Sequence, residues 1–279
     1  MPRSVHIGAA VAIALSLLGC RHDSAPPPAP KPEPHAPSPA PTPPPPAQPP
    51  TPAPVPMPEA PPPPPALREL FPLVRADIAA RVIEVEGLVP IDCHNPATPD
   101  VYLELVACTP DTREHESLVM TRARPSHLHA ALLAIGLKPG KPGSWKYENK
   151  KLIPIPPEGD GLALTLVYHD ANGAAIECPV SDWIIKARDG SRFAPRDRDA
   201  AKPSWVFAGS VMAKRQGNEV YDADGAGTLV GLCTFGSEVI AWRDTISPEA
   251  MVEEPVWIAD VKKVPVAGTP VIIRIRPAP

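Results

Sequence analysis

The sequence has few aromatic residues, few cysteines and little net charge. Phe, Trp and Tyr make up 5% of its 279 residues, and Cys occurs 5 times. It has 27 Lys and Arg against 31 Asp and Glu, which gives a formal net charge of −4, and the two signs are interspersed. Proteins that bind nucleic acid carry a clustered positive surface. We therefore expect no nucleic-acid partner.

Complete catalytic and metal-binding motifs are also missing. The stretch His115–Val119 departs from the H-E-x-x-H zinc motif, because Val119 holds the place of the second histidine. "YDADGAGTLVGLC" begins like a calcium loop, but Ala226 and Cys233 stand at ligand positions. No C-x-x-C pair indicates a redox site or a zinc ribbon. We therefore predict no catalytic residue and no metal ligand, and we interpret the glycine-rich stretch as a hairpin turn.

Long apolar runs are missing except for one near the N-terminus. Ile7 to Leu18 is apolar and small, and it carries no charge. A membrane-spanning helix needs about 20 apolar residues, so this run is typical of a signal peptide. It ends in Leu17-Leu18-Gly19-Cys20, which resembles the bacterial lipobox. We predict a lipoprotein signal peptide over residues 1–20; the alternative is an ordinary signal peptide followed by a chance cysteine.

The lipobox resemblance implies that Cys20 is the lipidation site. It implies a diacylglycerol on the Cys20 sulfur and an acyl chain, such as palmitate, on the new amino terminus. Two or more chains anchor a protein stably in a membrane, whereas one binds only marginally. Arg21 stands where an aspartate typically retains such proteins at the inner membrane. We expect a cell-envelope location, with the outer membrane favoured and the protein facing the periplasm, and no cofactor beyond the covalent lipid.

Proline is abundant, and it is concentrated before the remaining sequence. Residues 21–66 are rich in Pro and Ala, most densely from Ala25 to Pro65. Proline donates no backbone N–H and pushes the residue before it to an extended conformation, so the segment cannot bury a core. We expect a disordered, polyproline II-rich stalk; at about 3.1 Å per residue, roughly forty residues reach up to about 120 Å. The alternative is a ligand for an aromatic groove.

Residues 67–279 have the length of one domain with a sizeable core. Strand patterns dominate it, since apolar and β-branched residues alternate or run together between segments with Pro, Asn and Asp. The predicted strand segments are 81–91, 101–107, 116–123, 161–170, 174–187, 204–214, 228–235, 238–243 and 269–277. The sequence therefore predicts an α+β, mostly β class, with a single β-rich domain.

One amphipathic helix is predicted at about 126–135. Its apolar residues fall at i, i+3, i+4 and i+7, which makes one stripe. They are Leu128, Ala131, Leu132 and Ile135. Ser126 suits the N-cap, and Gly136 suits the C-terminal cap. We expect this helix to pack on the sheet.

Several motifs occur together in this domain. They are "LELVAC", "REHESLV", "HLHAALLAIGLKPG", "DWI", "WVFAGS" and "GTPV" before the last predicted strand. Jointly they resemble the YdjY-like domain of bacterial secreted proteins and lipoproteins, over residues 72–278. The resemblance implies kinship and leaves the mechanism open. It also implies that Cys93, Cys108, Glu114, His115, Glu116 and Ser117 occupy family motif positions. Cys178 lies outside the motifs, and Thr228 stands where relatives often have an acid.

The run Glu114-His115-Glu116-Ser117 is the candidate functional surface. In an extended segment alternate side chains point to opposite faces, so His115 and Ser117 would share one face and the two glutamates the other. At most two of the four groups can then act at one site. We predict a chiefly structural segment at the entry to a strand, which closes the preceding turn by hydrogen bonds to backbone N–H groups.

The four cysteines beyond the signal peptide are an even set, as expected of a protein in an oxidising compartment. Four cysteines allow three pairings. We favour Cys93 with Cys108, because they flank neighbouring predicted strands, and Cys178 with Cys233. One alternative is that some are buried thiols that behave as small hydrophobic residues. Another is a soft-metal site formed by Cys93, His94, Cys108 and His115.

These features favour a lipid-anchored envelope protein that displays its domain on a proline-rich stalk. We expect the domain to work by binding or assembly, with the membrane and an envelope protein as partners, and we assume no catalysis. The competing hypothesis is a metal- or thiol-dependent redox or hydrolytic protein. It would use Cys93, Cys108 and the Glu114–Ser117 run.

Overall fold

The computed structural model describes residues 66–97, 100–196, 199, 201–249, 252 and 257–279. The expected signal peptide, the lipidation site at Cys20 and the stalk, except for Ala66, lie outside the described residues. The part that is described is mostly β, as predicted. Neither α-helix within it has the length and apolar character needed to cross a membrane.

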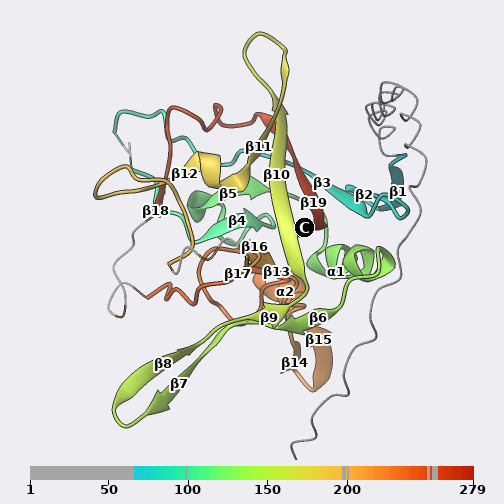
Figure 1. The fold of residues 1–279 in the computed structure, drawn as a ribbon, viewed down its shortest axis with the longest axis vertical. Helices are drawn as coiled ribbons and strands as arrows, with labels where there is room; N and C mark the ends of the chain where they lie inside the picture. The colour runs from blue at the N-terminus through green and yellow to red at the C-terminus, as the bar shows by residue number, and fades with distance from the viewer. Residues whose placement is uncertain (1–65, 98–99, 197–198, 200, 250–251, 253–256) are drawn as a thin grey trace, which may run out of the picture. The chain divides into compact units, whose positions relative to one another are not determined.

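Eight strands form a closed ring at the centre of the fold (Figure 1). Their order around the ring is β3 (Val82–Leu88), β19 (Pro270–Pro277), β10 (Gly161–His169), β13 (Trp205–Val206), β17 (Ile240–Trp242), β16 (Thr228–Gly231), β4 (Leu105–Cys108) and β5 (Ser117–Met120). The ring closes where Leu88 of β3 pairs with Met120 of β5. Neighbouring strands are antiparallel, except that β4 runs parallel to β5 and β16 to β17.

The other strands extend the ring or stand beside it. β1 (Arg68–Phe71) and β2 (Val74–Asp77) continue outward from β3, and β11 (Ala175–Pro179) pairs with β10. Four two-stranded pairs complete the described β structure: β6 (Pro139–Lys141) with β9 (Glu158–Gly159), β7 (Ser144–Glu148) with β8 (Lys151–Ile155), β12 (Ile184–Lys186) with β18 (Trp257–Ala259), and β14 (Met212–Arg215) with β15 (Asn218–Tyr221). Two single 3₁₀ turns are η1 (Glu114–Glu116) and η2 (Val180–Trp183).

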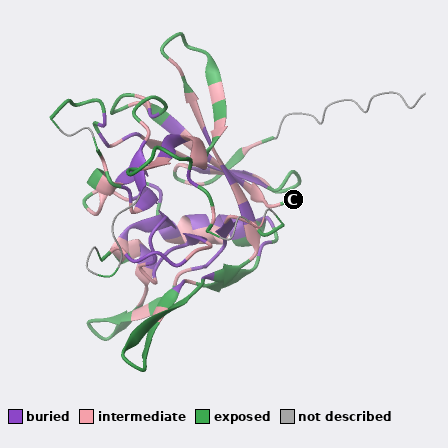
Figure 2. Cartoon of the chain, turned by 60° about the vertical axis from the view of Figure 1, so that its left-hand side comes forward, coloured by how far each residue is buried: buried purple, intermediate pink, exposed green. Residues whose placement is uncertain are grey.

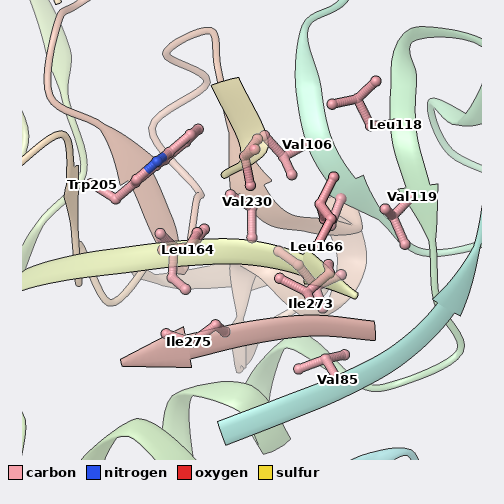
Figure 3. Close-up of a cluster of buried hydrophobic side chains, with 14 of the residues drawn as sticks. Val85, Val106, Leu118, Val119, Leu164, Leu166, Trp205, Val230, Ile273 and Ile275 are labelled. Carbon is pink, nitrogen blue, oxygen red and sulfur yellow. The ribbon is translucent and has the colours of Figure 1, made fainter. Parts of the chain in front are cut away.

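The interior of the ring is apolar because its strands alternate. In β10 the buried residues are Leu162, Leu164 and Leu166, and in β19 they are Val271, Ile273 and Ile275. Residues two apart on a strand share one face, so both strands turn a continuous apolar face inward. Figure 3 shows side chains from β3, β4, β5, β10, β13, β16 and β19 gathered in this core.

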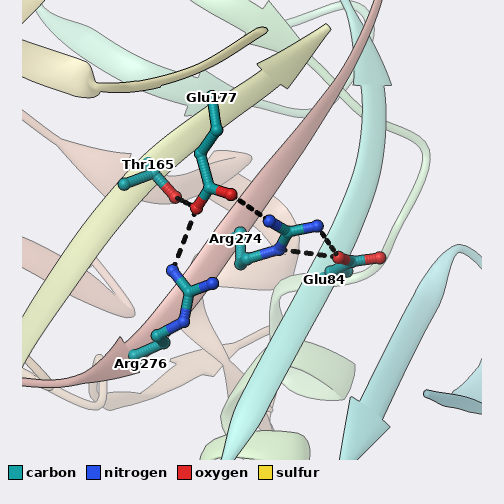
Figure 4. Close-up of polar contacts among 5 residues, drawn as sticks. All are labelled: Glu84, Thr165, Glu177, Arg274 and Arg276. Carbon is teal, nitrogen blue, oxygen red and sulfur yellow. Dashed lines mark hydrogen bonds and ion pairs between the residues drawn. The ribbon is translucent and has the colours of Figure 1, made fainter. Parts of the chain in front are cut away.

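The outer face of β3, β19 and β10 carries a charged network instead (Figure 4). Arg274 donates to one Glu84 oxygen from Nε at 2.8 Å and from Nη2 at 2.7 Å. Arg274 also pairs with Glu177, which accepts from Arg276 at 3.0 Å and from the Thr165 hydroxyl at 2.7 Å. Glu84 is only 3% exposed, so its charge depends on Arg274 for compensation.

Gly87 permits the closure of the ring. A Cβ atom at this position would lie 2.6 Å from the carbonyl oxygen of Met120 and 2.6 Å from a methyl carbon of Val119. Side chains do not approach backbone that closely, so only glycine lets β3 reach β5. The closing pair Leu88–Met120 therefore requires a glycine at the neighbouring position 87.

Helix α1 (Pro125–Ala134) confirms the predicted helix and its apolar stripe. Leu128, Ala131, Leu132 and Ile135 are all buried, and α1 packs against β2, β3 and β16. Gly136 follows with φ +81°, its N–H donates to the Leu133 carbonyl, and the Leu137 N–H donates to the Leu132 carbonyl. This pair of bonds is the Schellman arrangement that ends a helix at glycine.

Two local predictions near the helices were wrong. The N-cap of α1 is Arg124 rather than Ser126, because Pro125 suits the first helical position. Ser126 instead donates its N–H and its hydroxyl to Asp224, both at 2.8 Å. Asp224 lies in a second short helix, α2 (Asp222–Ala226), where the sequence had suggested a hairpin turn. Gly227 ends α2 with φ +73°, and β16 then begins at Thr228, as expected.

Candidate functional site

The run Glu114–Ser117 forms a helical turn followed by a strand, and the predicted extended geometry is wrong for its first three residues. Glu114–Glu116 is the 3₁₀ turn η1, and Ser117 begins β5. The Glu114 carboxylate accepts the backbone N–H groups of Asp111 and Thr112, which curls the chain before the strand. The Ser117 hydroxyl donates to the Arg113 carbonyl at 2.8 Å. Glu114 thus closes the preceding turn in the way expected of the segment.

The four side chains of this run have different surroundings. Ser117 is fully buried, whereas the His115 side chain is 74% exposed and that of Glu116 is 32% exposed. The His115 Nε2 lies 3.4 Å from a Glu116 carboxylate oxygen. Glu114 is occupied by the turn. His115 and Glu116 are therefore the two members of the run whose side chains do not hydrogen-bond to the backbone of the turn.

Glu116 has a carboxyl neighbour that sequence reasoning did not identify. Leu105 pairs with Ser117 in the parallel β4–β5 ladder, so Glu104 and Glu116 enter their strands side by side. The Glu104 N–H donates to the Glu116 carbonyl at 3.0 Å. Burial, followed by the hydrogen bond and charge of the Glu116 carboxyl, raises the pKa of Glu104 to about 8. We refer to Glu104 and Glu116 as the carboxyl pair.

Arg113 lies between the carboxyl pair and a buried acid. Its Nε is 3.7 Å from Glu104, and its guanidinium stacks 4.1 Å from the centre of the Phe235 ring. Glu238 is fully buried, and one of its carboxylate oxygens accepts the N–H groups of Phe235 and Gly236. Burial raises the pKa of Glu238, and these hydrogen bonds oppose the rise. The positive charge of Arg113 partly offsets the rise in pKa of both Glu104 and Glu238.

Comparison of the sequence with models of protein families identifies the family of this chain. The model described as the YdjY domain matches residues 74–276. The chain belongs to the YdjY family. Comparisons with curated proteins and with solved structures gave no match. The YdjY match covers the whole ring except Pro277, the last residue of β19, and it confirms the resemblance seen in the sequence.

The predicted disulfides of the YdjY domain are not formed. None of its four described cysteines is bridged; Cys93, Cys108 and Cys233 are buried, and Cys178 is partly exposed. The expectation that Cys93 and Cys108 flank neighbouring strands is wrong, because the strand neighbours of Cys108 are Thr228 and Met120 and Cys93 lies outside the strands. Cys178 lies opposite Leu166 on β10, whereas the Cys233 N–H donates to the Glu104 carbonyl.

The thiols are poorly suited to nucleophilic chemistry. Burial raises the pKa of Cys93 and of Cys108, and it raises the pKa of Cys178 to about 11. The thiolate is the reactive form, so these cysteines are held in the inert form near neutral pH. Cys93 and Cys233 pack in the apolar core as small hydrophobic residues do.

The residues of the soft-metal alternative do not converge. Within the described part of the chain, no three His, Cys, Asp or Glu side chains are grouped so that they could hold a metal ion. The His94 Nε2 lies 2.9 Å from the Val264 carbonyl, and Cys108 is buried in β4. His115 is instead on the surface of η1.

His115 and Glu116 line a surface pocket of about 430 Å³. The pocket is also lined by the polar residues Asp92, Asp100 and Tyr102 and by the apolar residues Pro90, Ile91 and Val101. The pocket is acidic and partly apolar. The carboxyl pair can hold or release a proton beside this pocket, because the raised pKa of Glu104 keeps that group protonated near pH 7.

A projecting hairpin is the second candidate surface of the YdjY domain. β7 and β8 form it, and we call residues Ser144–Ile155 the arm. Every strand residue of the arm is exposed except Trp145, which is half-buried. Tyr147 is 71% exposed, and Leu152 is 46% exposed. Figure 2 shows the arm as an exposed extension, in contrast to the buried strands of the ring.

Proposed function

We propose that this protein is a lipid-anchored envelope protein that displays its YdjY domain on a proline-rich stalk, and that the domain works by binding or assembly. The anchoring rests on the order of the N-terminal features, an apolar run followed by Leu17-Leu18-Gly19-Cys20. The stalk rests on the proline content of residues 21–66, since such a segment cannot bury a core. We place the protein in the cell envelope, at the outer membrane and facing the periplasm.

Binding is supported chiefly by the arm. Soluble domains bury most large apolar side chains, and contiguous exposed ones mark interaction sites. The arm exposes Tyr147 and Leu152 side by side on one face of its two-stranded ribbon, and Ile153 and Ile155 on the other face. A two-stranded ribbon is marginally stable by itself in water, so a partner surface would stabilise it.

The competing thiol-dependent function has weaker support. Burial raises the pKa of both Cys93 and Cys108, so neither is poised as a thiolate. Iodoacetamide should therefore leave both residues unmodified in the folded protein near pH 7. Rapid labelling of either one would favour the enzymatic hypothesis over binding.

Lipidation is tested with a Cys20→Ser variant of the full chain in a bacterial host. The wild type should incorporate a labelled fatty acid and sediment with membranes, and Cys20→Ser should lose both properties. Cys178→Ser is the matched control, because Cys178 is the partly exposed cysteine of the described domain and should affect neither property. Equal labelling and sedimentation of wild type and Cys20→Ser would contradict the proposed anchor.

A further inference from the structure

The arm has one open edge and one blocked edge. Asn149 and Lys150 have φ values of 52° and 62°, and Glu148 pairs with Lys151 across them. Two such residues form the type I′ turn of a tight hairpin, in which the pair next to the turn is hydrogen-bonded. Hydrogen-bonded and non-hydrogen-bonded pairs alternate along an antiparallel ladder. The backbone groups of Trp145 and Tyr147 therefore point outward from β7.

The same alternation determines the outer edge of β8. Its outward positions are Leu152 and Pro154, which pair with Tyr147 and Trp145 respectively. Proline has no N–H to donate, so Pro154 blocks strand addition at that edge. Only β7 offers a continuous edge with donors and acceptors. An added strand would therefore join the arm at β7.

The β7 edge is complementary in charge to itself. Lys146 and Glu148 flank Tyr147, share one face of the ribbon, and form an ion pair with 3.1 Å between Nζ and the carboxylate. If a second β7 runs antiparallel with Tyr147 at the two-fold axis, each Lys146 lies opposite Glu148 of the other copy. The outward-pointing Tyr147 groups then form the central hydrogen-bonded pair. The register shifted by two residues would place Lys146 opposite Lys146, which is destabilising.

The opposite face of the ribbon is apolar and would also be continuous. Tyr147 pairs with Leu152 on this face within one arm. With Tyr147 at the two-fold axis, four side chains would form one row across the ribbon: Leu152 and Tyr147 of one copy, then Tyr147 and Leu152 of the other. Aromatic cross-strand pairs stabilise a sheet, and an isologous two-fold interface needs such self-complementarity.

We propose that the partner of the arm is a second copy of this chain, joined through β7 into a four-stranded antiparallel ribbon. The inference rests on the proposed binding function and names its partner. A sheet of four strands has the stability that an exposed hairpin lacks. It also covers Tyr147, which is the most exposed large apolar side chain of the arm.

The experiment places a photo-cross-linker at the two-fold position. Tyr147→p-benzoylphenylalanine is introduced into the full chain in a bacterial host, and the cells are irradiated. A cross-linked species of twice the chain mass, containing only this chain, is expected. Met212→p-benzoylphenylalanine is the control, because Met212 is 60% exposed on a different hairpin, β14–β15, and should give no such species. Cross-linking at Tyr147 to a different protein only, or to no protein, would overturn the proposal.

Charge exchange tests the register. Lys146→Glu places like charges opposite each other on both sides of the central Tyr147 pair, and the dimeric cross-link should fall about tenfold. Combining Lys146→Glu with Glu148→Lys restores opposite charges and should restore the yield. No loss in the single variant, or no recovery in the double variant, would reject the proposed pairing. Membrane fractions of the same cells distinguish failure of the pairing from failure of the anchor. If the protein sediments with membranes but gives no cross-linked dimer, the β7 pairing is rejected and the lipid anchor is not.

Discussion

The ring and the arm are both built from antiparallel strands, yet they obey different rules. In the ring, β10 and β19 pair over seven residues and bury alternate side chains on one face. In the arm, β7 and β8 pair over five residues and bury almost nothing. Pairing alone therefore does not decide stability. The apolar face that pairing creates must be covered, and of these two regions the ring covers its apolar face whereas the arm does not.

The largest effect is expected where α1 covers the ring. Leu132→Asp should destabilise the domain by at least about 4 kcal/mol, because it removes a buried side chain and buries an unpaired charge. Leu133→Asp is the control, since Leu133 is the next residue on the same helix and is 47% exposed. Thermal melts of both variants measure the difference. Similar melting temperatures would mean that the wrong face of α1 has been assigned to the core.

A smaller loss is expected on the outer face of the ring. Arg274→Ala leaves Glu84 buried without its partner and should cost about 3 kcal/mol. Arg276→Ala should cost well under 1 kcal/mol, because the Arg276 side chain is 39% exposed and pairs with the partly exposed Glu177. Urea denaturation of the two variants gives both values. Equal losses would show that Glu84 does not depend on Arg274.

The carboxyl pair makes stability depend on pH. The raised pKa of Glu104 means that the folded state holds a proton which the unfolded state releases above about pH 4.5. Its contribution is therefore fully present below that pH and is lost as pH rises toward about 8. Glu104→Gln should remove this decline, so melts between pH 5 and pH 9 should be flatter than those of the wild type. Parallel curves for the two proteins would exclude a titrating Glu104.

Within the Glu114–Ser117 run, replacing Glu114 should lower the stability of the domain more than replacing His115. Glu114→Ala removes the acceptor of two backbone N–H groups and should cost about 1 kcal/mol. His115→Ala should change stability by less than about 0.5 kcal/mol, because that side chain is exposed. Chemical denaturation resolves a difference of this size. A greater loss in His115→Ala would assign His115 a contact that its exposed position does not provide.

The smallest effect on folding is expected in the arm. Tyr147→Ser should change the free energy of unfolding of the monomeric domain by less than about 0.5 kcal/mol, because the Tyr147 side chain is 71% exposed. The measurement is a melt at a protein concentration low enough to exclude self-association. A loss comparable to that of Arg274→Ala would show that arm and ring form one cooperative unit.

Regular periodicity made much of the ring predictable. Strand β10 alternates strictly, β19 keeps β-branched residues on its buried face, and the apolar stripe of α1 has the helical period, so all three were recognised from local sequence. The closure between Leu88 and Met120 was not predictable, because it depends on two strands that local patterns cannot bring together. Gly87 marks the point of closure only once its neighbour is known.

The site and the arm escaped prediction for different reasons. Glu114 redirects the backbone through its own carboxylate, and this overrides the strand pattern that follows it. The carboxyl pair arises from parallel pairing, which places Glu104 beside a residue twelve positions later in the sequence. The arm was missed because Pro154 and Pro156 argue against a strand, although an edge strand tolerates proline at an outward position.

The position of β19 sets the order in which the domain can fold. Strand β19 lies between β3 and β10, although β3 is Val82–Leu88 and β19 is Pro270–Pro277. A ribosome supplies β3 long before its partner, and closing so large a loop slows folding. Until β19 arrives, the inward residues of β3 and an unpaired strand edge stay open to aggregation. Folding of the ring is thus a late event, and a nascent chain halted before Pro270 would depend on chaperones for its solubility.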